Sequence, residues 1–352
     1  MARKPLRIAL VAPLYESVPP ALYGGTERVV SYLAEELVAL GHHVTLFASG
    51  DSVTSAHLVP ACERALRLDP RVPEPVSLHV TMIEQVFKRS NEFDVIHFHI
   101  DGFHLPLTRR HSVATLTTLH GRLDLLGLDV LYREFNEHPL VSISHAQRRP
   151  LAWANWAKTV HHGLPLNLHR LGAGGGQYLA FLGRISPEKR VDRAIEIARR
   201  VGIPLKIAAK VDRADRDYFT AQIEPWIDGN LIEYLGEIGE REKTSFLGNA
   251  LALLFPIDWP EPFGLAMIEA MSCGTPVIAF RRGSVPEVID EGVTGYVVDH
   301  LDDAVACVKR VQRLSRTRCR EIFETRFSAT RMAQDYCAVY ELLGEKRWPL
   351  RA

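Results

Sequence analysis

The sequence predicts an α/β protein built from two doubly wound parallel-sheet domains. Its 352 residues exceed the roughly 250–300 that one hydrophobic core usually serves. Short apolar runs rich in Val, Ile and Leu alternate with longer amphipathic stretches, which is typical of strand–helix–strand units and a parallel sheet. This alternation stops at a glycine-rich stretch near residue 174 and then begins again, which indicates a second domain.

The strongest helical pattern of the first half covers residues 27–40, where Leu33, Leu37 and Leu40 recur at helical spacing and a glycine follows. The first apolar run follows basic residues, as in a signal peptide, but it is short and stops at Pro13, so a buried strand is the better interpretation. The expected strands are residues 7–13, 43–48, 94–99, 113–119, 140–144 and 158–162.

Four glycines within five positions of the segment 171–177 predict a flexible linker, because such a composition does not suit the interior of a helix or strand. Beyond it, strands are expected at 178–182, 205–209, 231–235, 252–255, 277–280 and 295–298, and helices at 188–201, 240–249 and 265–272. The predicted organisation is therefore an N-terminal domain (1–170), the linker (171–177), a C-terminal domain (178–328) and a last segment (329–352) whose helix could pack back on the first domain.

Composition argues against several classes of partner. Lys plus Arg equals Asp plus Glu, at 42 each, so neither a nucleic-acid binder nor an enzyme docked on anionic lipid is suggested. Five widely spaced cysteines favour free thiols in a reducing compartment, hence a cytoplasmic location. No apolar run approaches the roughly 18–20 residues of a membrane span.

The strongest motif of the chain covers residues 261–276. Pro262 and Gly264 suit a loop rather than a helix interior, so the helix is expected to begin near Leu265, with its free N–H groups available to an anion. Glu261 precedes this helix, and Glu269 lies inside it, where a carboxylate could accept hydrogen bonds from a ribose diol. A solvent-facing Glu269 on an amphipathic helix is the structural alternative.

A second motif covers residues 181–190, read as a strand, a turn at Gly183 and a helix opening at Ser186 and the following proline. Arg184 and Lys189 would flank that helix start, where two cations could neutralise a diphosphate leaving group. Solvated charges on a capped surface helix explain the same residues about equally well.

Together these motifs resemble glycosyltransferase family 4, a retaining family of GT-B fold. The resemblance includes the Glu-x7-Glu element from Glu261 to Glu269, the Gly-Arg turn with Lys189, Cys-Gly-Thr-Pro-Val at 273–277 and the glycine turns at 283 and 292. It implies two domains facing across a cleft. It implies that the donor pyrophosphate and ribose are held by Gly183, Arg184, Lys189 and Glu269, and that the donor sugar and its phosphate are contacted by Glu261 and by the backbone of Phe263, Gly264 and Leu265.

The N-terminal half contributes weaker candidates. Gly24 and Gly25 precede the first long helix and could approach a phosphate closely, although a plain loop is the alternative. The resemblance places these glycines near the donor phosphates. It also makes His120, at the end of the expected strand 113–119, a sugar-contacting catalytic residue. The acceptor-side candidates are His99, Arg122 and Ser144, and the loops 103–110 and 122–132 are expected to read the acceptor.

Fifteen histidines make a metal site worth weighing. His97 and His99 alternate onto one face of a strand, but no third ligand stands at a telling spacing, and the resembled family is generally metal-independent. The stretch 148–158 mixes two Trp with three cations and could touch a membrane surface, although packing or an acceptor-side role fits better. We therefore expect no metal and no cofactor.

The sequence thus predicts a retaining glycosyltransferase that moves a sugar from a nucleoside diphosphate sugar, with UDP favoured from family frequency, to a hydroxyl. Glu261 is the one carboxylate expected near the sugar, and no covalent role is assigned to it. Two alternatives stay open: a sugar-nucleotide 2-epimerase of the same fold and a non-catalytic sugar-nucleotide-binding module.

Overall fold

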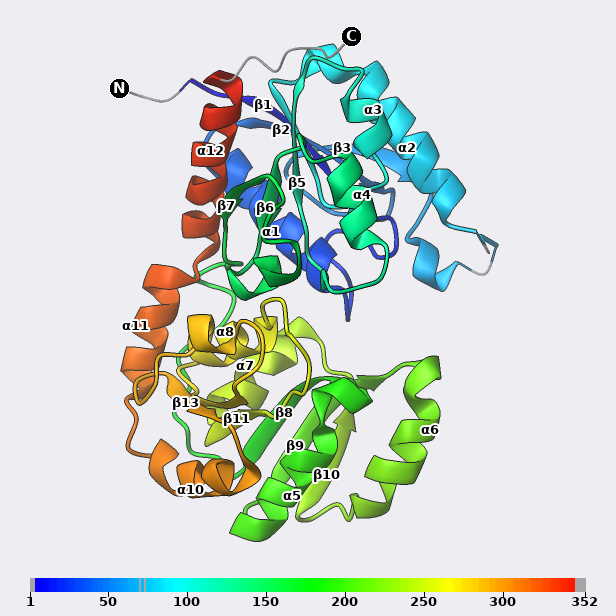
Figure 1. The fold of residues 1–352 in the computed structure, drawn as a ribbon. Helices are drawn as coiled ribbons and strands as arrows, with labels where there is room; N and C mark the ends of the chain where they lie inside the picture. Colours follow the sequence, from blue (N-terminus) through cyan, green and yellow to red (C-terminus); the bar gives the residue numbers. More distant parts are fainter. Residues whose placement is uncertain (1–3, 70, 73, 346–352) are drawn as a thin grey trace. The chain divides into compact units, whose positions relative to one another are not determined.

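A computed structural model of the chain describes residues 4–69, 71–72 and 74–345. The chain divides into two compact units (Figure 1). The first contains the residues up to Gly163 together with those from Ala329 onward, and the second is Leu164–Ser328. No helix among the described residues combines the length and the apolar character needed to cross a lipid bilayer.

The first unit is built on a seven-stranded parallel sheet with the order β3-β2-β1-β4-β5-β6-β7. The strand order reverses between β1 and β4, where Ile8 pairs with both Val44 and Val95. The strands are β1 (Arg7–Val11), β2 (His43–Ser49), β3 (His57–Cys62), β4 (Val95–Phe98), β5 (Ala114–Thr118), β6 (Leu140–Ser142) and β7 (Trp156–Thr159).

Helices cover both faces of this sheet. On one face, Met82 and Val86 of α2 pack in a cluster with Val11, Phe47 and Ile96. On the other face, α1 and the last helix, α12, lie side by side (Figure 1). The helices are α1 (Gly25–Ala39), α2 (Val76–Lys88), α3 (Leu105–Thr108), α4 (Leu128–Glu134) and α12 (Ala329–Glu345), with short 3₁₀ turns η1 (Leu66–Leu68), η2 (Ser90–Glu92) and η3 (Ala146–Leu151).

Helix α12 returns the chain to the first unit through two buried tyrosines. The hydroxyl of Tyr340 lies 2.8 Å from Nδ1 of His97, and that of Tyr336 lies 2.9 Å from Oγ1 of Thr118. Because buried tyrosine hydroxyls need partners, these bonds fix the docking of α12 on β4 and β5.

The second unit has a six-stranded parallel sheet with the order β10-β9-β8-β11-β12-β13, which reverses between β8 and β11. Its strands are β8 (Leu179–Ile185), β9 (Leu205–Val211), β10 (Ile232–Gly236), β11 (Ala252–Phe255), β12 (Val277–Phe280) and β13 (Gly295–Val298). Its helices are α5 (Val191–Val201), α6 (Arg216–Tyr218), α7 (Glu240–Asn249), α8 (Leu265–Ser272), α9 (Val285–Val288), α10 (Leu301–Val311) and α11 (Arg316–Arg326). Short turns are η4 (Pro187–Lys189), η5 (Arg213–Asp215), η6 (Phe219–Ile223) and η7 (Glu224–Trp226).

The expected turn at Gly183 and helix opening at Ser186 differ from the structure. Gly183 and Arg184 lie inside β8, which stays paired with β9 as far as Ile185. A 3₁₀ turn then ends at Lys189, and the φ of 55° at Arg190 interrupts the helical conformation, so α5 begins at Val191. The Ser186 hydroxyl makes no cap bond to this turn.

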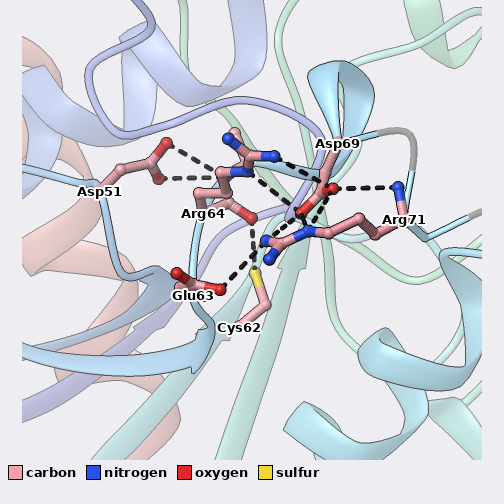
Figure 2. A network of polar contacts seen from close by, with 7 residues as sticks. Asp51, Cys62, Glu63, Arg64, Asp69 and Arg71 are labelled. Atoms are coloured by element: carbon pink, nitrogen blue, oxygen red, sulfur yellow. Dashed lines mark hydrogen bonds and ion pairs between the residues drawn. The ribbon is translucent and has the colours of Figure 1, made fainter.

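Strand β3 and helix α2 were absent from the sequence expectations. Strand β3 is half-exposed at the sheet edge, so it lacks the apolar run of a buried strand. The loop that follows is held by Asp69, which Figure 2 shows between the guanidinium groups of Arg64 and Arg71. Arg71 and Arg64 hold the pKa of the Asp69 carboxyl well below its usual range.

This loop supports the segment that follows β1. The backbone N–H of Leu66 donates to the Leu14 carbonyl at 2.8 Å, and Arg67 pairs with Glu16 at 3.1 Å. Nearby, Glu27 lies in the first turn of α1 and is only 4% exposed. Burial raises the pKa of this carboxyl to about 6, against a smaller opposing effect of Arg67.

The glycine-rich segment is part of the second unit and is bound to it. Its backbone N–H groups at Gly172, Gly174 and Gly176 donate to carbonyls of the second unit at 3.0–3.1 Å. A Cβ at Gly172 would lie 2.1 Å from the Gly248 carbonyl oxygen, so close backbone approach explains this glycine. The expectation of a flexible linker here is therefore replaced by a packed segment.

Arg316 organises this packed segment. Its half-buried guanidinium donates to the carbonyls of Gly172, Gly248, Ala250 and Cys273 and to the Thr275 hydroxyl, at 2.6–3.3 Å.

We expect Arg316→Ala to lower the free energy of unfolding by about 3 kcal/mol, because it removes the side-chain donor to the Gly172 and Ala250 carbonyls and one of the two donors to those of Gly248 and Cys273. Urea denaturation followed by fluorescence measures this loss. Arg318→Ala on the same helix is the control, since among the described residues the Arg318 side chain makes an exposed pair with Glu321 alone, and the loss of that pair should cost about 0.5 kcal/mol or less. Equal effects of the two variants would contradict the role given to Arg316.

Glu27 provides a pH-dependent prediction. Because its pKa is about 6 in the fold and 4.5 in the unfolded chain, folding opposes ionisation, and stability falls as pH rises through this interval. Glu27→Gln removes that cost. The difference in unfolding free energy between the variant and the wild type should therefore shift by about 2 kcal/mol in favour of the variant from pH 4.5 to pH 7.5. Denaturation at both pH values measures the gain, with Glu35→Gln on the same helix as the control. A gain that is the same at both pH values would refute the assignment.

Candidate active site

The reversal of strand order marks the candidate site of the second unit. Open parallel sheets bind ligands beyond the carboxyl ends of their strands, at the point where strand order reverses. In this unit those ends belong to β8 and β11, and the segments that follow them carry Lys189 and Glu261.

Lys189 and Glu261 meet although 72 residues separate them. The Lys189 ammonium donates to Oε2 of Glu261 at 2.5 Å, and the indole N–H of Trp259 donates to the same oxygen at 2.8 Å. The ammonium also lies 4.7 Å from the centre of the Trp259 ring. Glu261 is only 7% exposed, and a buried carboxylate is costly unless it is paired. The Lys189 ammonium and the Trp259 N–H supply the partners that this charge needs.

Asp258 fixes the loops around this pair. Its carboxylate pairs with Arg190, Arg193 and Arg282 at 2.8–3.2 Å, and its backbone N–H donates to the Glu188 carbonyl at 2.8 Å. The surrounding guanidinium groups lower the pKa of Asp258 despite its desolvation. The loops after β8, β11 and β12 are thereby joined at one carboxylate.

Close backbone packing places Glu261. Gly283 has a φ of 52°, and a Cβ there would lie 2.2 Å from the Glu261 carbonyl oxygen. The next residue, Ser284, donates its backbone N–H to the Glu261 carbonyl at 3.0 Å and its hydroxyl to the Phe263 carbonyl at 2.8 Å. The Phe263 ring is buried against Phe327, so the segment before α8 is held from both sides.

Helix α8 begins at Leu265, in agreement with the sequence expectation, after a left-handed Gly264 with φ 82°. Glu269 lies inside it and is 4% exposed, which argues against a solvent-facing side chain. Its carboxylate accepts a hydrogen bond at 2.7 Å from Lys243 of α7, which also contacts Glu240 at 3.1 Å. Glu269 is thus a buried anion held by a neighbouring helix.

Arg184 lies in acidic surroundings. Its guanidinium pairs with Glu188 and has two further carboxylates, Asp212 and Asp215, at 3.6 Å. The two expected phosphate-binding cations therefore differ, since within the described part of the chain Lys189 pairs with one carboxylate and Arg184 with three.

The first unit gathers histidines at the carboxyl ends of β4 and β5. The rings of His97 and His99 lie 4.0 Å apart, which confirms that they share a face, and Nδ1 of His99 lies 2.8 Å from Nε2 of His120. His162 stacks on His120 with ring centres 5.3 Å apart. Burial lowers the pKa of each of these imidazoles, that of His120 to about 3, so they are neutral at physiological pH.

Gln147 braces the backbone around His120. Its side-chain N–H groups donate to the carbonyls of Leu119 and Gly121 at 2.9 and 2.7 Å, and its Oε1 accepts from the Ile143 N–H at 2.9 Å. The buried Ser144 hydroxyl accepts from the Gln147 backbone N–H at 3.0 Å. Ser144, an acceptor-side candidate, thus has a local structural role in this brace.

The segment after His120 carries a surface hollow of about 320 Å³. Its lining residues are Leu123, Asp124, Leu125, Leu126, Asp129, Pro150 and Leu151. Leu125, Leu126 and Val130 expose at least half of their surface, whereas Arg122 is tied to Asp124 at 2.6 Å. The hollow lies in the loop 122–132 that the sequence assigned to acceptor recognition.

The two glycines before α1 have different surroundings. A Cβ at Gly24 would lie 2.8 Å from Pro20, so packing within the loop already accounts for this glycine. Gly25 is the first residue of α1, where backbone N–H groups have no partner within the helix.

Sequence reasoning missed four residues that shape these sites: Trp259, Lys243, Gln147 and Asp258. Only Lys243 left a readable signal, the helical i,i+3 spacing from Glu240. Among the described residues, no group of three or more His, Cys, Asp or Glu side chains is placed to hold a metal ion.

Two family models match consecutive parts of the chain. The model described as Glycosyltransferase Family 4 matches residues 23–163, and that of Glycosyl transferases group 1 matches residues 171–329. The matches correspond to the two compact units, and each contains the candidate residues of its unit.

Individual relatives extend the comparison. The phosphatidyl-myo-inositol mannosyltransferase of Mycobacterium leprae is 25% identical and aligns over 85% of each chain. The crystal structure of AviGT4, a glycosyltransferase involved in avilamycin A biosynthesis, covers 98% of this chain and 100% of its own at a TM-score of 0.73 and 24% identity. Anabaena HepE in complex with UDP-glucose covers 97% and 100% at a TM-score of 0.72 and 16% identity.

The parallel sheets with reversed strand order, the two family models and the full-length structural matches agree with the resemblance found in the sequence. The chain therefore belongs to glycosyltransferase family 4 and is a glycosyltransferase of GT-B fold.

Proposed function

We propose that this glycosyltransferase transfers a sugar from a nucleoside diphosphate donor, a UDP-sugar, to an acceptor hydroxyl with retention of configuration. The observation that carries the proposal is the Lys189–Glu261 contact at the strand reversal of the second unit. It joins a cation suited to a diphosphate with a carboxylate suited to sugar hydroxyls.

Lys189 is the principal cation for the leaving group. An ammonium has three N–H donors, and among the described residues Glu261 alone accepts from Lys189, so the proposal assigns the other two donors to phosphate oxygens. Arg184 assists, but its three carboxylate neighbours offset much of its charge. In this proposal side-chain cations stabilise the departing diphosphate, and no resident metal or cofactor takes part.

Helix α8 would bind the nucleotide. Glu269 accepts hydrogen bonds from the ribose hydroxyls, with Lys243 balancing its buried charge. The N–H groups at Gly264 and Leu265 stand at the start of the helix, where an anion is favoured. Gly183 would allow close approach of a ligand, because among the described residues a Cβ there would meet the Phe181 ring alone, at 3.9 Å.

Further proposed roles concern the sugar and the acceptor. His120 contacts the transferred sugar, and Gly25 with Gly24 contacts the donor phosphates. The hollow after His120 receives the acceptor, and Arg122 directly precedes its first lining residue in the sequence. The UDP-glucose complex of HepE supports a UDP-sugar donor, since that protein shares the fold.

Retention is proposed to proceed without a covalent intermediate on a side chain. Glu261 already accepts two hydrogen bonds, from Lys189 and Trp259, which suits it to orient hydroxyl groups rather than to attack. Positioning and electrostatic stabilisation of the leaving group then supply the acceleration.

Nucleotide binding tests the base and the ribose contact together. UDP should raise the melting temperature of the protein more than GDP or ADP at equal concentration.

Glu269→Gln should weaken UDP binding about tenfold in calorimetry, because it removes a charged acceptor for the ribose. Glu240→Gln is the matched control, since Glu240 also contacts Lys243. Equal weakening by both variants would assign the effect to the ion pair instead of the ribose.

Lys189→Ala should lower kcat for transfer by about 10²–10³, because it removes a donor to the charge that develops on the leaving group. The rate is measured with a donor sugar that carries whichever nucleotide, UDP, GDP or ADP, binds most tightly in the melting experiment. Lys206→Ala, at the amino end of β9 and paired with Glu233, is the control and should retain the wild-type rate. A wild-type rate for Lys189→Ala would remove the basis of the leaving-group role.

A further inference from the structure

Trp259 contacts both members of the ion pair at the candidate site. Its indole N–H donates to Oε2 of Glu261 at 2.8 Å, and the centre of its ring lies 4.7 Å from the Lys189 ammonium. An indole nitrogen can only donate a hydrogen bond, so the direction of the first contact is unambiguous. One side chain therefore touches the cation proposed for the diphosphate and the carboxylate proposed for the donor sugar.

The backbone holds Trp259 and Glu261 in this arrangement. The Glu261 N–H donates to the Trp259 carbonyl at 2.8 Å, which closes a tight three-residue turn. On the other side of Trp259, the backbone N–H of Asp258 donates to the Glu188 carbonyl at 2.8 Å, and the Asp258 carboxylate is paired with arginines. The indole is thus carried by a segment that is fixed on both sides.

The bonds to Glu261 divide its two carboxylate oxygens. Oε2 accepts from both Lys189 and Trp259, and about two hydrogen bonds are the capacity of one carboxylate oxygen. Among the described residues no hydrogen bond reaches Oε1, and Oε1 is not one of their buried polar atoms that lack a partner, so this oxygen is open to solvent. Oε2 is therefore occupied, and Oε1 keeps its capacity for hydroxyl donors.

The indole bond adds orientation that Lys189 by itself does not supply. The terminal torsion of a Glu side chain has a broad energy minimum, and a Lys ammonium stands on a flexible stem, so one bond between them leaves the carboxylate able to exchange its oxygens. The indole is rigid and its N–H has a single direction. A second donor of fixed direction on the same oxygen holds the plane of the carboxylate before any ligand binds.

We propose that Trp259 is a positioning residue: its N–H holds Oε2 of Glu261 beside Lys189, so that Oε1 is the oxygen that accepts hydrogen bonds from the hydroxyl groups of the donor sugar. The inference rests on the proposed function for the contact between Glu261 and the sugar, and it adds which oxygen makes that contact and what orients it. Because the N–H bonds to Glu261 and the ring contacts Lys189, loss of the N–H alone should impair recognition of the sugar and spare that of the nucleotide.

Trp259→Phe separates the two contacts, because Phe keeps an aromatic ring for Lys189 but has no N–H. We expect the Kd of UDP to stay within about twofold of the wild type, and kcat/KM for the sugar nucleotide to fall about tenfold. Calorimetry measures the first value. Release of UDP measures the second, with whichever of UDP-glucose, UDP-galactose and UDP-N-acetylglucosamine the wild type uses fastest.

Trp226→Phe is the matched control. Trp226 also lies over a cation, Arg199 at 4.2 Å, but it precedes β10 and Arg199 is in the last turn of α5, so this pair belongs to the amino ends of the strands. Both values should stay at the wild-type level in Trp226→Phe. A wild-type kcat/KM in Trp259→Phe, or a loss of UDP affinity as large as the loss of kcat/KM, would overturn the proposal.

An isosteric replacement covers the case in which Trp259→Phe does not fold. Site-specific replacement of Trp259 by β-(3-benzothienyl)alanine keeps the bicyclic ring and exchanges its N–H for sulfur. The same split is expected, with the Kd of UDP unchanged and kcat/KM about tenfold lower, because the hydrogen-bond donor alone is removed. An unchanged kcat/KM in this protein would refute the positioning role.

A double-mutant cycle shows whether Trp259 acts through Glu261. Glu261→Gln should lower kcat/KM, and adding Trp259→Phe should not lower it further by more than about twofold, because the carboxylate to be oriented is already absent. Additive losses would overturn the inference and leave the role of Glu261 intact. A wild-type kcat/KM in Glu261→Gln would instead refute the sugar contact within the proposed function, and the inference with it.

Discussion

The ion pair of Lys189 and Glu261 is the contact on which the rest of the second unit depends. Burying either charge alone would be costly, so the two segments that carry them must come together when the sheet forms. Asp258 pairs with guanidinium groups of the neighbouring loops, and the lack of a Cβ at Gly283 allows the Glu261 backbone to approach closely. The fold thus builds a charged, tightly braced pair at the reversal of strand order.

The first unit uses the same topology with different chemistry. Its strand order also reverses, between β1 and β4, and the ends of β4 and β5 carry His99 and His120. Burial keeps these imidazoles neutral, so this unit offers directed hydrogen bonds, while the second offers charges. Gln147 and helix α12 hold the histidines in place through groups that the sequence motifs do not include.

Elements with a strong local pattern were predictable. The bounds of α7 and α8 and of strands β11, β12 and β13 agree with the sequence expectations, because their apolar runs and capping glycines are local signals. Strand β3 escaped because an edge strand is half-exposed, and the start of α5 moved because Arg190 adopts a left-handed conformation. The glycine-rich segment was interpreted as flexible because its composition does not reveal the carbonyls that approach it.

The sequence by itself determined the two-domain α/β architecture, the family and the residue types of the candidate site, since periodicity and motif spacing are properties of the chain. Only the tertiary structure decided that Lys189 contacts Glu261, that Lys243 balances Glu269 and that His99 bonds to His120. These contacts join segments 21 to 72 residues apart. Strand order and register bring such segments together. No local pattern in the sequence specifies which distant side chain will pair with a buried charge or hydrogen-bond to a buried imidazole.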